Sequence, residues 1–221
     1  MKRNAGRLKV EKQVFILSFS SIYRWLAEGL LPRAIELKSK LRRFRKRKRA
    51  KKTASKGNAR SIRQRSKSML RRRRFGDWEV DTISFGCFPN QTTAAERRSR
   101  YTALVVLKNI KRKTVMRAFE LIFADTRLPL HTITSDRRMG FNCHNQFEER
   151  FQVPFYYTDT GKPYQKPTIE NTNDPLKQYL PKNTQVHELP AQKIPQIMSA
   201  LNNRTRKCLG FRTPCEVLLL S

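Results

Sequence analysis

Phe75-Gly-Asp-Trp-Glu-Val-Asp-Thr-Ile-Ser-Phe-Gly86 is the stretch of sequence that decides the fold, because acidic and apolar residues alternate along it. Residues two apart on a β-strand point to the same side of a sheet, so Asp77, Glu79 and Asp81 share one side of a strand predicted near 78–84. Carboxylates between buried apolar neighbours are unfavourable unless a cation compensates them. The stretch therefore predicts a strand with a cation-binding side.

The residues after this strand continue as a regular series of elements. Further strands are expected near 92–97, 101–107, 132–135 and 153–157, and helices near 113–125, 144–150, 168–180 and 190–203. Three strands in succession, followed by helix, strand, helix, strand and helix, are consistent with a ribonuclease H-like α/β fold, whereas a doubly wound fold alternates from its start. We expect a mixed five-stranded sheet with flanking helices over residues 75–221.

The charge of the chain is concentrated at its N-terminal end. Its 221 residues carry 48 Lys and Arg against 17 Asp and Glu, and residues 1–74 hold 27 of the basic and 3 of the acidic side chains. This excess predicts a polyanionic partner, nucleic acid first and an anionic membrane second. No apolar run approaches the roughly 18 residues needed to span a bilayer, and the chain does not start with a signal-peptide pattern. We expect a cytoplasmic protein without a membrane partner.

Residues 1–32 contain one short predicted helix, over about 20–28. Ser18 or Ser20 is its expected N-cap, and Gly29 its stop. Such a helix suits the second element of a helix-turn-helix, where Ser21 and Arg24 would reach the major groove of DNA. A surface helix that docks on the core is the alternative.

Residues 33–74 form a basic segment with few apolar side chains. It cannot bury enough apolar surface to fold alone, so we expect a mobile linker, partly disordered and helical when bound. The density of positive charge favours phosphate binding over a passive linker. The candidate DNA-binding residues are Arg42, Arg43, Arg45, Lys46, Arg47, Lys48, Arg49, Arg71, Arg72, Arg73 and Arg74.

Three acids from separate elements could converge on one site. Asp81 lies on the first strand, Asp136 follows the apolar strand 131–135 where ligands usually bind, and Glu170 begins a predicted helix. Phosphodiester chemistry needs such carboxylates, which hold two Mg²⁺ about 4 Å apart. Taken singly, each acid is also explained as a turn former or as a complement to a helix dipole. The cysteines form no C-x-x-C pair and the histidines are scattered, so no zinc site is predicted.

The strings around these acids are more specific than their spacing. The run 75–86 resembles the G-H-W-E-x-D-x-x-x-G opening of the insertion-sequence transposases of the "IS thirty" family, whose integrase-like catalytic core carries an Asp-Asp-Glu triad. Collinear matches to the same family follow at Glu96-Arg-Arg-Ser-Arg-Tyr-Thr-Ala-Leu-Val-Val106, Ile133-Thr-Ser-Asp-Arg137, Glu170-Asn-Thr-Asn173, Leu176-Lys-Gln-Tyr-Leu-Pro-Lys-Asn-Thr184 and Leu201-Asn-Asn-Arg-Thr-Arg-Lys-Cys-Leu-Gly-Phe-Arg-Thr-Pro-Cys-Glu216. Upstream, Ser20-Ser-Ile-Tyr-Arg-Trp-Leu26 resembles the end of the family's longer helix-turn-helix region, so the resemblance implies a truncated N-terminus.

The resemblance implies a DNA transposase that cleaves and joins strands with Mg²⁺ or Mn²⁺ held by Asp81, Asp136 and Glu170. Its implied partners are double-stranded DNA, as element ends and as target, and further copies of the chain in a synaptic complex. Gln165 and Lys166 fall where the family has a W-Q-R motif near the DNA. Asn171 and Asn173 would support the helix that carries the glutamate.

The departures from the family pattern lie near the chemistry. Asp77 replaces a usual His, and Arg138 and Gly140 stand in an altered D-R-G-x-E motif. Pro175 falls inside the helix that carries Glu170, where a proline costs about 3 kcal/mol and would tilt the glutamate. A catalytically impaired DNA-binding remnant of a transposase is therefore the alternative function, and a basic structural or RNA-associated protein is a third.

Overall fold

The computed structural model describes residues 7, 10–11, 18–30, 60–83, 90–124, 129–137, 143–180 and 189–220. Its centre is a mixed six-stranded sheet in the order β1-β6-β5-β2-β3-β4. The strands are β1 (Arg60–Ser61), β2 (Asp77–Ile83), β3 (Asn90–Glu96), β4 (Thr102–Leu107), β5 (Thr132–Ser135) and β6 (Phe155–Tyr157). β2, β3 and β4 form an antiparallel meander, and β5, β6 and β1 extend it in parallel from β2. The five expected strands and the α/β class are confirmed.

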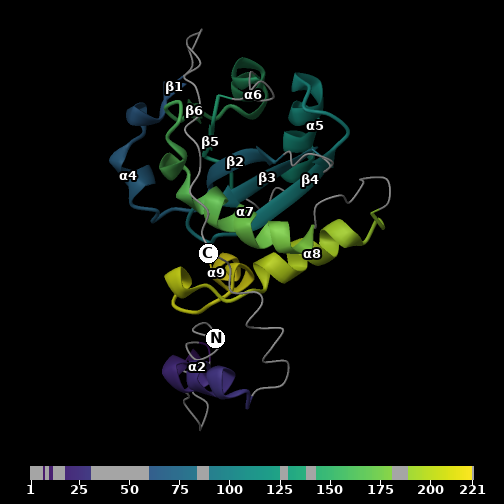
Figure 1. The fold of residues 1–221 in the computed structure, drawn as a ribbon. Coiled ribbons are helices and arrows are strands. Elements are labelled where there is room, and N and C mark those ends of the chain that lie inside the picture. Colours follow the sequence, from purple (N-terminus) through teal and green to yellow (C-terminus); the bar gives the residue numbers. More distant parts are fainter. Residues whose placement is uncertain are drawn as a thin grey trace.

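Helices cover both faces of this sheet (Figure 1). One face packs against α5 (Arg112–Ile122) and α6 (His144–Phe151). The other face packs against α7 (Pro167–Tyr179) and α8 (Lys193–Asn202), through a small cluster around Leu104, Leu176 and Leu201. β2 lies between these two layers of helices, which cover both of its faces.

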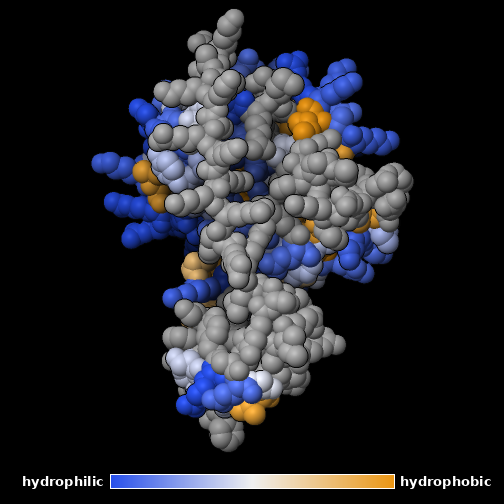
Figure 2. All heavy atoms as spheres, in the orientation of Figure 1, coloured by the Kyte–Doolittle hydropathy of each residue, from blue (hydrophilic) through white to orange (hydrophobic). Residues whose placement is uncertain are grey.

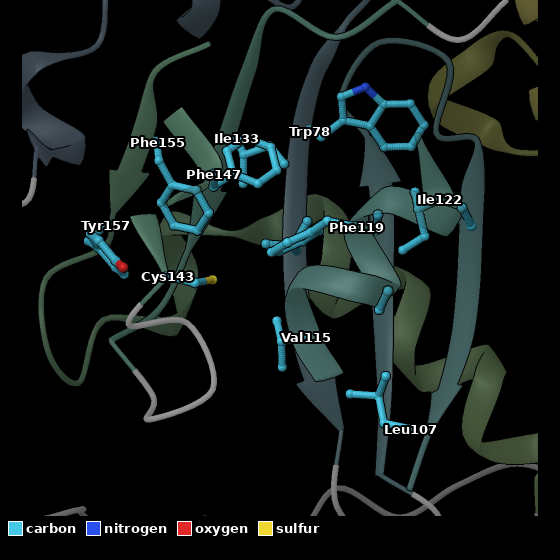
Figure 3. Packing of buried hydrophobic residues seen from close by; sticks show 14 residues of the cluster. Trp78, Leu107, Val115, Phe119, Ile122, Ile133, Cys143, Phe147, Phe155 and Tyr157 are labelled. Atoms are coloured by element: carbon cyan, nitrogen blue, oxygen red, sulfur yellow. The ribbon is translucent and has the colours of Figure 1, made fainter. Parts of the chain in front are cut away.

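Aromatic side chains fill the α5 and α6 face (Figure 3). Trp78, Phe119, Phe147 and Phe155 are fully buried there. The Phe119 and Phe147 rings meet edge to face with centroids 5.0 Å apart, and Phe147 meets Phe155 in the same way at 5.3 Å. The Trp78 indole donates a hydrogen bond to the Pro129 carbonyl oxygen, which satisfies the one polar atom of that ring. This apolar face fixes the orientation of β2 and so turns its acidic residues toward α7.

Part of the segment expected to be a linker belongs to the folded domain. Residues 60–74 contain β1, the short 3-10 helix η1 (Ile62–Gln64) and α4 (Lys67–Leu70), and the side chain of Met69 is buried. The Arg97 guanidinium donates to the Met69 carbonyl oxygen at 2.8 Å. β1 pairs with β6 and makes the sheet six-stranded instead of five-stranded, because these residues gain long-range partners that local composition does not reveal.

The N-terminal helix α2 (Phe19–Glu28) forms where it is expected. The Ser18 hydroxyl oxygen accepts from the Ser20 N–H, so Ser18 is the N-cap. At the other end Gly29 has a φ of +80°, and the N–H of residue 30 bonds to the Trp25 carbonyl, which ends the helix. In Figure 1, α2 lies on the side of α9 that faces away from the sheet.

The C-terminal end folds as η5 (Lys207–Leu209) and α9 (Pro214–Leu219). Thr213 caps α9, and the Arg7 guanidinium binds the Glu216 carboxylate with two hydrogen bonds of 2.7 Å. Among the described residues, no helix is long and apolar enough to cross a membrane. Hydrophilic residues cover most of the described surface in the space-filling view (Figure 2).

Candidate functional site

Strand register brings Asp81 and Asp136 together at one edge of the sheet. Glu79 on β2 is opposite Thr134 on β5 in a parallel pair. Asp81 lies two residues after Glu79, and Asp136 lies two residues after Thr134. Both aspartates therefore point to the same face of the sheet as that pair. Neighbouring strands lie about 4.8 Å apart, so the two aspartates are adjacent. Both are partly exposed, with side-chain exposures of 17% and 25%.

The ammonium group of Lys166 lies between these two carboxylates. Its Nζ atom is 3.4 Å from Asp81 Oδ1 and 3.5 Å from Asp136 Oδ2, and it donates to the Val80 carbonyl oxygen at 3.1 Å. The lysine itself is buried, with 4% of its surface exposed. The ammonium group of Lys166 is therefore a cation that both aspartates share.

Helix α7 supplies the other side of the site. The Asn173 side-chain amide donates to Asp81 Oδ2 at 2.8 Å, which leaves Oδ1 toward Lys166. Glu170 lies three residues before Asn173 on α7, so the two side chains leave the helix from neighbouring positions, while Lys166 is the residue just before the helix. The Glu170 N–H bonds to the Lys166 carbonyl at 3.3 Å. Asn171, in contrast, is exposed.

Pro175 does not end the helix that carries Glu170. α7 continues from Pro167 to Tyr179 with Pro175 inside it, and only the Asn171 carbonyl loses its intrahelical N–H partner. Arg138 and Gly140, the other departures near the chemistry, lie outside the described residues.

The donor set at this edge suits a hard divalent cation. Mg²⁺ prefers carboxylate and carbonyl oxygens, and Asp81 and Asp136 present such oxygens around one cationic group. Within the described ranges, no three His, Cys, Asp or Glu side chains lie close enough together to hold a metal ion. Glu170 therefore lies on α7 beside the two aspartates but does not form a three-carboxylate group with them in this structure.

A buried ion pair anchors the start of α7 beside the site. Glu79 is fully buried, and its Oε2 accepts from the N–H groups of Thr168 and Ile169 at 2.8 and 3.1 Å. Its Oε1 lies 3.1 Å from Arg97 Nε, although the two atoms are not aligned as a hydrogen bond. Burial lowers the pKa of the Arg97 guanidinium, and the neighbouring Glu79 carboxylate opposes that shift. Glu79 therefore fixes where α7 begins.

The remaining carboxylate of the strand, Asp77, also has its own partners. Arg74 donates to both of its oxygens, at 3.0 and 2.9 Å, and the Thr132 hydroxyl donates at 2.7 Å. The bond to Asp77 raises the pKa of Arg74. Of the arginines expected to bind DNA, Arg74 is thus engaged within the fold, while Arg71 and Arg73 are exposed and Arg72 is half-buried.

The other candidate DNA-binding residues fall in different places. Gln165 binds Asp159 through both the backbone N–H and the carboxylate of that residue. Asp159 also accepts from Lys162 at 2.9 Å and from Arg63 at 3.1 Å, and these bonds, Lys162 first, lower its pKa to about 2. On α2, Arg24 is exposed and Ser21 half-buried. The residues Arg42, Arg43, Arg45, Lys46, Arg47, Lys48 and Arg49 lie outside the described part of the chain.

Two features of the site are not visible in the spacing of the acids. The resemblance implies that Lys166 lies near the DNA, and the structure adds that its ammonium is buried between Asp81 and Asp136. The sequence also does not single out Glu79 as the anchor of α7. The β2–β3 register in the structure sets Glu96 opposite Trp78 and so brings Arg97 beside the acidic side of β2, and this register is not given by the sequence alone.

The fold is that of an integrase catalytic core. The chain resembles the catalytic core domain of HTLV-2 integrase in complex with magnesium (dimeric form), with a TM-score of 0.51 and 14% identity, over 65% of this chain and 95% of that chain. It also resembles the catalytic core domain of BIV integrase, with a TM-score of 0.50 and 17% identity, over 65% of this chain and 93% of that one. The expected ribonuclease H-like integrase core is thereby confirmed.

Relatives by sequence identify the family. The chain is 34% identical over 162 residues to the transposase InsI for insertion sequence element IS30A of Escherichia coli (strain K12), a match that covers 73% of this chain and 42% of that relative. It is 30% identical over 219 residues to the transposase for insertion sequence element IS4351 of Bacteroides fragilis, covering 96% of this chain and 66% of the relative. No family model matches the chain. The chain belongs to the IS30 family of insertion-sequence transposases, and it spans less than half the length of the Escherichia coli relative.

Proposed function

We propose that the chain acts as a DNA transposase, a polynucleotidyl transferase in which Asp81, Asp136 and Glu170 hold Mg²⁺ or Mn²⁺. The observation that carries this proposal is the convergence of Asp81 and Asp136 around a cationic group at the carboxyl end of β2 and β5. Ligands bind at this end of a sheet, and phosphodiester chemistry needs oxygen ligands for hard cations. The family and the integrase fold support the same activity.

When bound, the metal would activate the attacking oxygen and stabilise the leaving oxygen of the phosphodiester. The residues of the chain have separate tasks around it. Asp81 and Asp136 present their oxygens from a rigid sheet, and Asn173 orients Asp81 by its hydrogen bond to Oδ2. Glu170 would join them from α7, whose first turn is fixed by Glu79. Rigid placement of this kind favours catalysis because the reacting groups need little reorganisation.

The partner that we propose is double-stranded DNA, both as element ends and as target. The excess of basic side chains in residues 1–74 supports this, because Lys and Arg that neutralise DNA phosphates release the counterions condensed on the DNA. Arg24 on α2 and Arg71 and Arg73 after α4 are exposed and available to phosphates. Several copies of the chain would act together in a synaptic complex. The impaired remnant is the less favoured alternative, since α7 passes through Pro175 intact.

The test is strand cleavage and joining by the purified chain with Mn²⁺, on DNA that carries the inverted repeats flanking its gene. Asp81→Asn should abolish the product and leave DNA binding unchanged. Glu120→Gln is the matched control, because Glu120 pairs with Arg117 on the exposed side of α5, on the face of the sheet opposite α7, and it should retain activity. A wild-type chain that binds the matched ends but yields no Mn²⁺-dependent product would contradict the proposal in favour of the remnant.

A further inference from the structure

Lys166 is a buried cation at a place where two acids meet. All three hydrogens of an ammonium can be donated, and three oxygens lie within 3.5 Å of this one, from Val80, Asp81 and Asp136. Lysine is almost never buried unless it is paired. Two aspartates in contact repel each other unless a positive charge stands between them. Lys166 supplies that charge.

We propose that Lys166 is an internal counter-cation of Asp81 and Asp136, and that a divalent cation binds these aspartates only by displacing its ammonium group. This inference rests on the metal site of the proposed function. Asp81 Oδ2 is occupied by the Asn173 amide, so Oδ1 is the oxygen that it offers to a cation shared with Asp136. That oxygen is the one that Lys166 contacts. Metal and lysine therefore compete for the same atoms, and Lys166 sets the metal affinity.

The geometry of the ion pairs permits this exchange. Charge-assisted hydrogen bonds in proteins are usually about 2.7–2.9 Å long. The contacts of Lys166 with Asp81 and Asp136 are longer, at 3.4 and 3.5 Å, and both aspartates are partly open to solvent. A lysine is a point charge on a flexible four-carbon stem, which can move away without disturbing the backbone. The two aspartates thus hold the lysine loosely enough to release it.

The experiment measures Mn²⁺ binding to the full chain by electron paramagnetic resonance, with no DNA and no turnover. Lys166→Met removes the competing charge at similar side-chain length, and it should bind Mn²⁺ about tenfold more tightly than the wild type, which corresponds to about 1.4 kcal/mol. Lys162→Met is the matched control, since Lys162 pairs with Asp159 outside the site, and its affinity should equal that of the wild type. Asp81→Asn should lose binding.

A second readout uses the unaltered chain and so does not depend on the folding of a variant. Lys166 should resist an amine-reactive label without metal, because it is buried, and become reactive when Mn²⁺ is added, as measured by mass spectrometry. Lys162, which is partly exposed, should react equally in both conditions. Unchanged protection of Lys166 at saturating Mn²⁺, or wild-type affinity in Lys166→Met, overturns the displacement while leaving the metal site intact. Failure of the wild type to bind Mn²⁺ more tightly than Asp81→Asn would instead reject the metal site itself.

Discussion

Replacing Glu79 by glutamine tests whether the buried ion pair positions α7. The substitution keeps the size of the side chain and removes its charge, while the Arg97 guanidinium stays buried with 5% of its surface exposed. Breaking a buried pair and leaving one charge without its partner costs about 3–5 kcal/mol. The bonds from Thr168 and Ile169 also weaken, since a hydrogen bond to a charged group contributes about 1.5–3 kcal/mol and one to a neutral group about 1 kcal/mol. Both effects arise from the loss of the same carboxylate charge, so we expect Glu79→Gln to lower the free energy of unfolding by about 3–5 kcal/mol with the weakened hydrogen bonds included.

The assay is thermal and urea denaturation followed by circular dichroism. Each kcal/mol lowers the melting temperature of a chain of this size by about 2–4 °C, so a fall of roughly 6–20 °C is expected. Glu120→Gln is the control, because its pair with Arg117 is exposed and worth about 0–1 kcal/mol. Adding Arg97→Met to Glu79→Gln should recover part of the stability, since no unpaired charge remains. A loss in Glu79→Gln no larger than that of Glu120→Gln would refute the reasoning.

Three further predictions concern separate parts of the fold. Gly76→Ala should lower the free energy of unfolding by about 3 kcal/mol, because the residue has a φ of +92° and a new Cβ would lie 2.8 Å from the His131 ring. The control is Gly161→Ala, where φ is +75° but the space around the new Cβ is open. This control should cost about 1 kcal/mol in the same urea titration. The Asp159 carboxyl, whose pKa is lowered to about 2, should stabilise the fold above about pH 4 and lose that effect as the pH falls toward 2. An unfolding series over this window should therefore lose part of its pH dependence in Asp159→Asn, and an unchanged slope would contradict the pairing. Asn202→Asp should cost about 1–3 kcal/mol, because the amide both donates to and accepts from the backbone of β4, whereas the exposed Asn203→Asp should stay within about 0.5 kcal/mol of the wild type by thermal melting.

The sequence predicts the centre of the fold well because its signals there are local. The alternation at 77–81 and the apolar runs of β4 and β5 each define a strand without reference to distant residues. β1 is different, since two polar residues become a strand only by pairing with β6, nearly a hundred residues away. Composition alone assigns such a segment to a linker.

The same distinction applies to the site. Asp81 and Asp136 are expected together because the ends of neighbouring parallel strands coincide, and register depends on the apolar pattern. The position of the Lys166 ammonium depends on the path of the chain through η3 (Pro163–Gln165) into α7, which no periodicity encodes. The resemblance to the family singles out Lys166 as part of a motif, but only the fold shows that Asp81 and Asp136 are its neighbours.

The acidic side of β2 shows how one strand combines structural and exchangeable ion pairs. Asp77 and Glu79 have 1% and 0% of their side-chain surface exposed, and each is matched by an arginine, whose planar fork is rigid and remains charged. Asp81 is the one of the three with an exposed edge, at 17%, and its cation is a lysine. A strand of three identical arginine pairs would be stable and closed to ligands. Asp81, the third carboxylate, instead pairs with the flexible side chain of Lys166 at the open end of the sheet. Within the five residues 77–81, two acids therefore stabilise the fold and the third can exchange its cation.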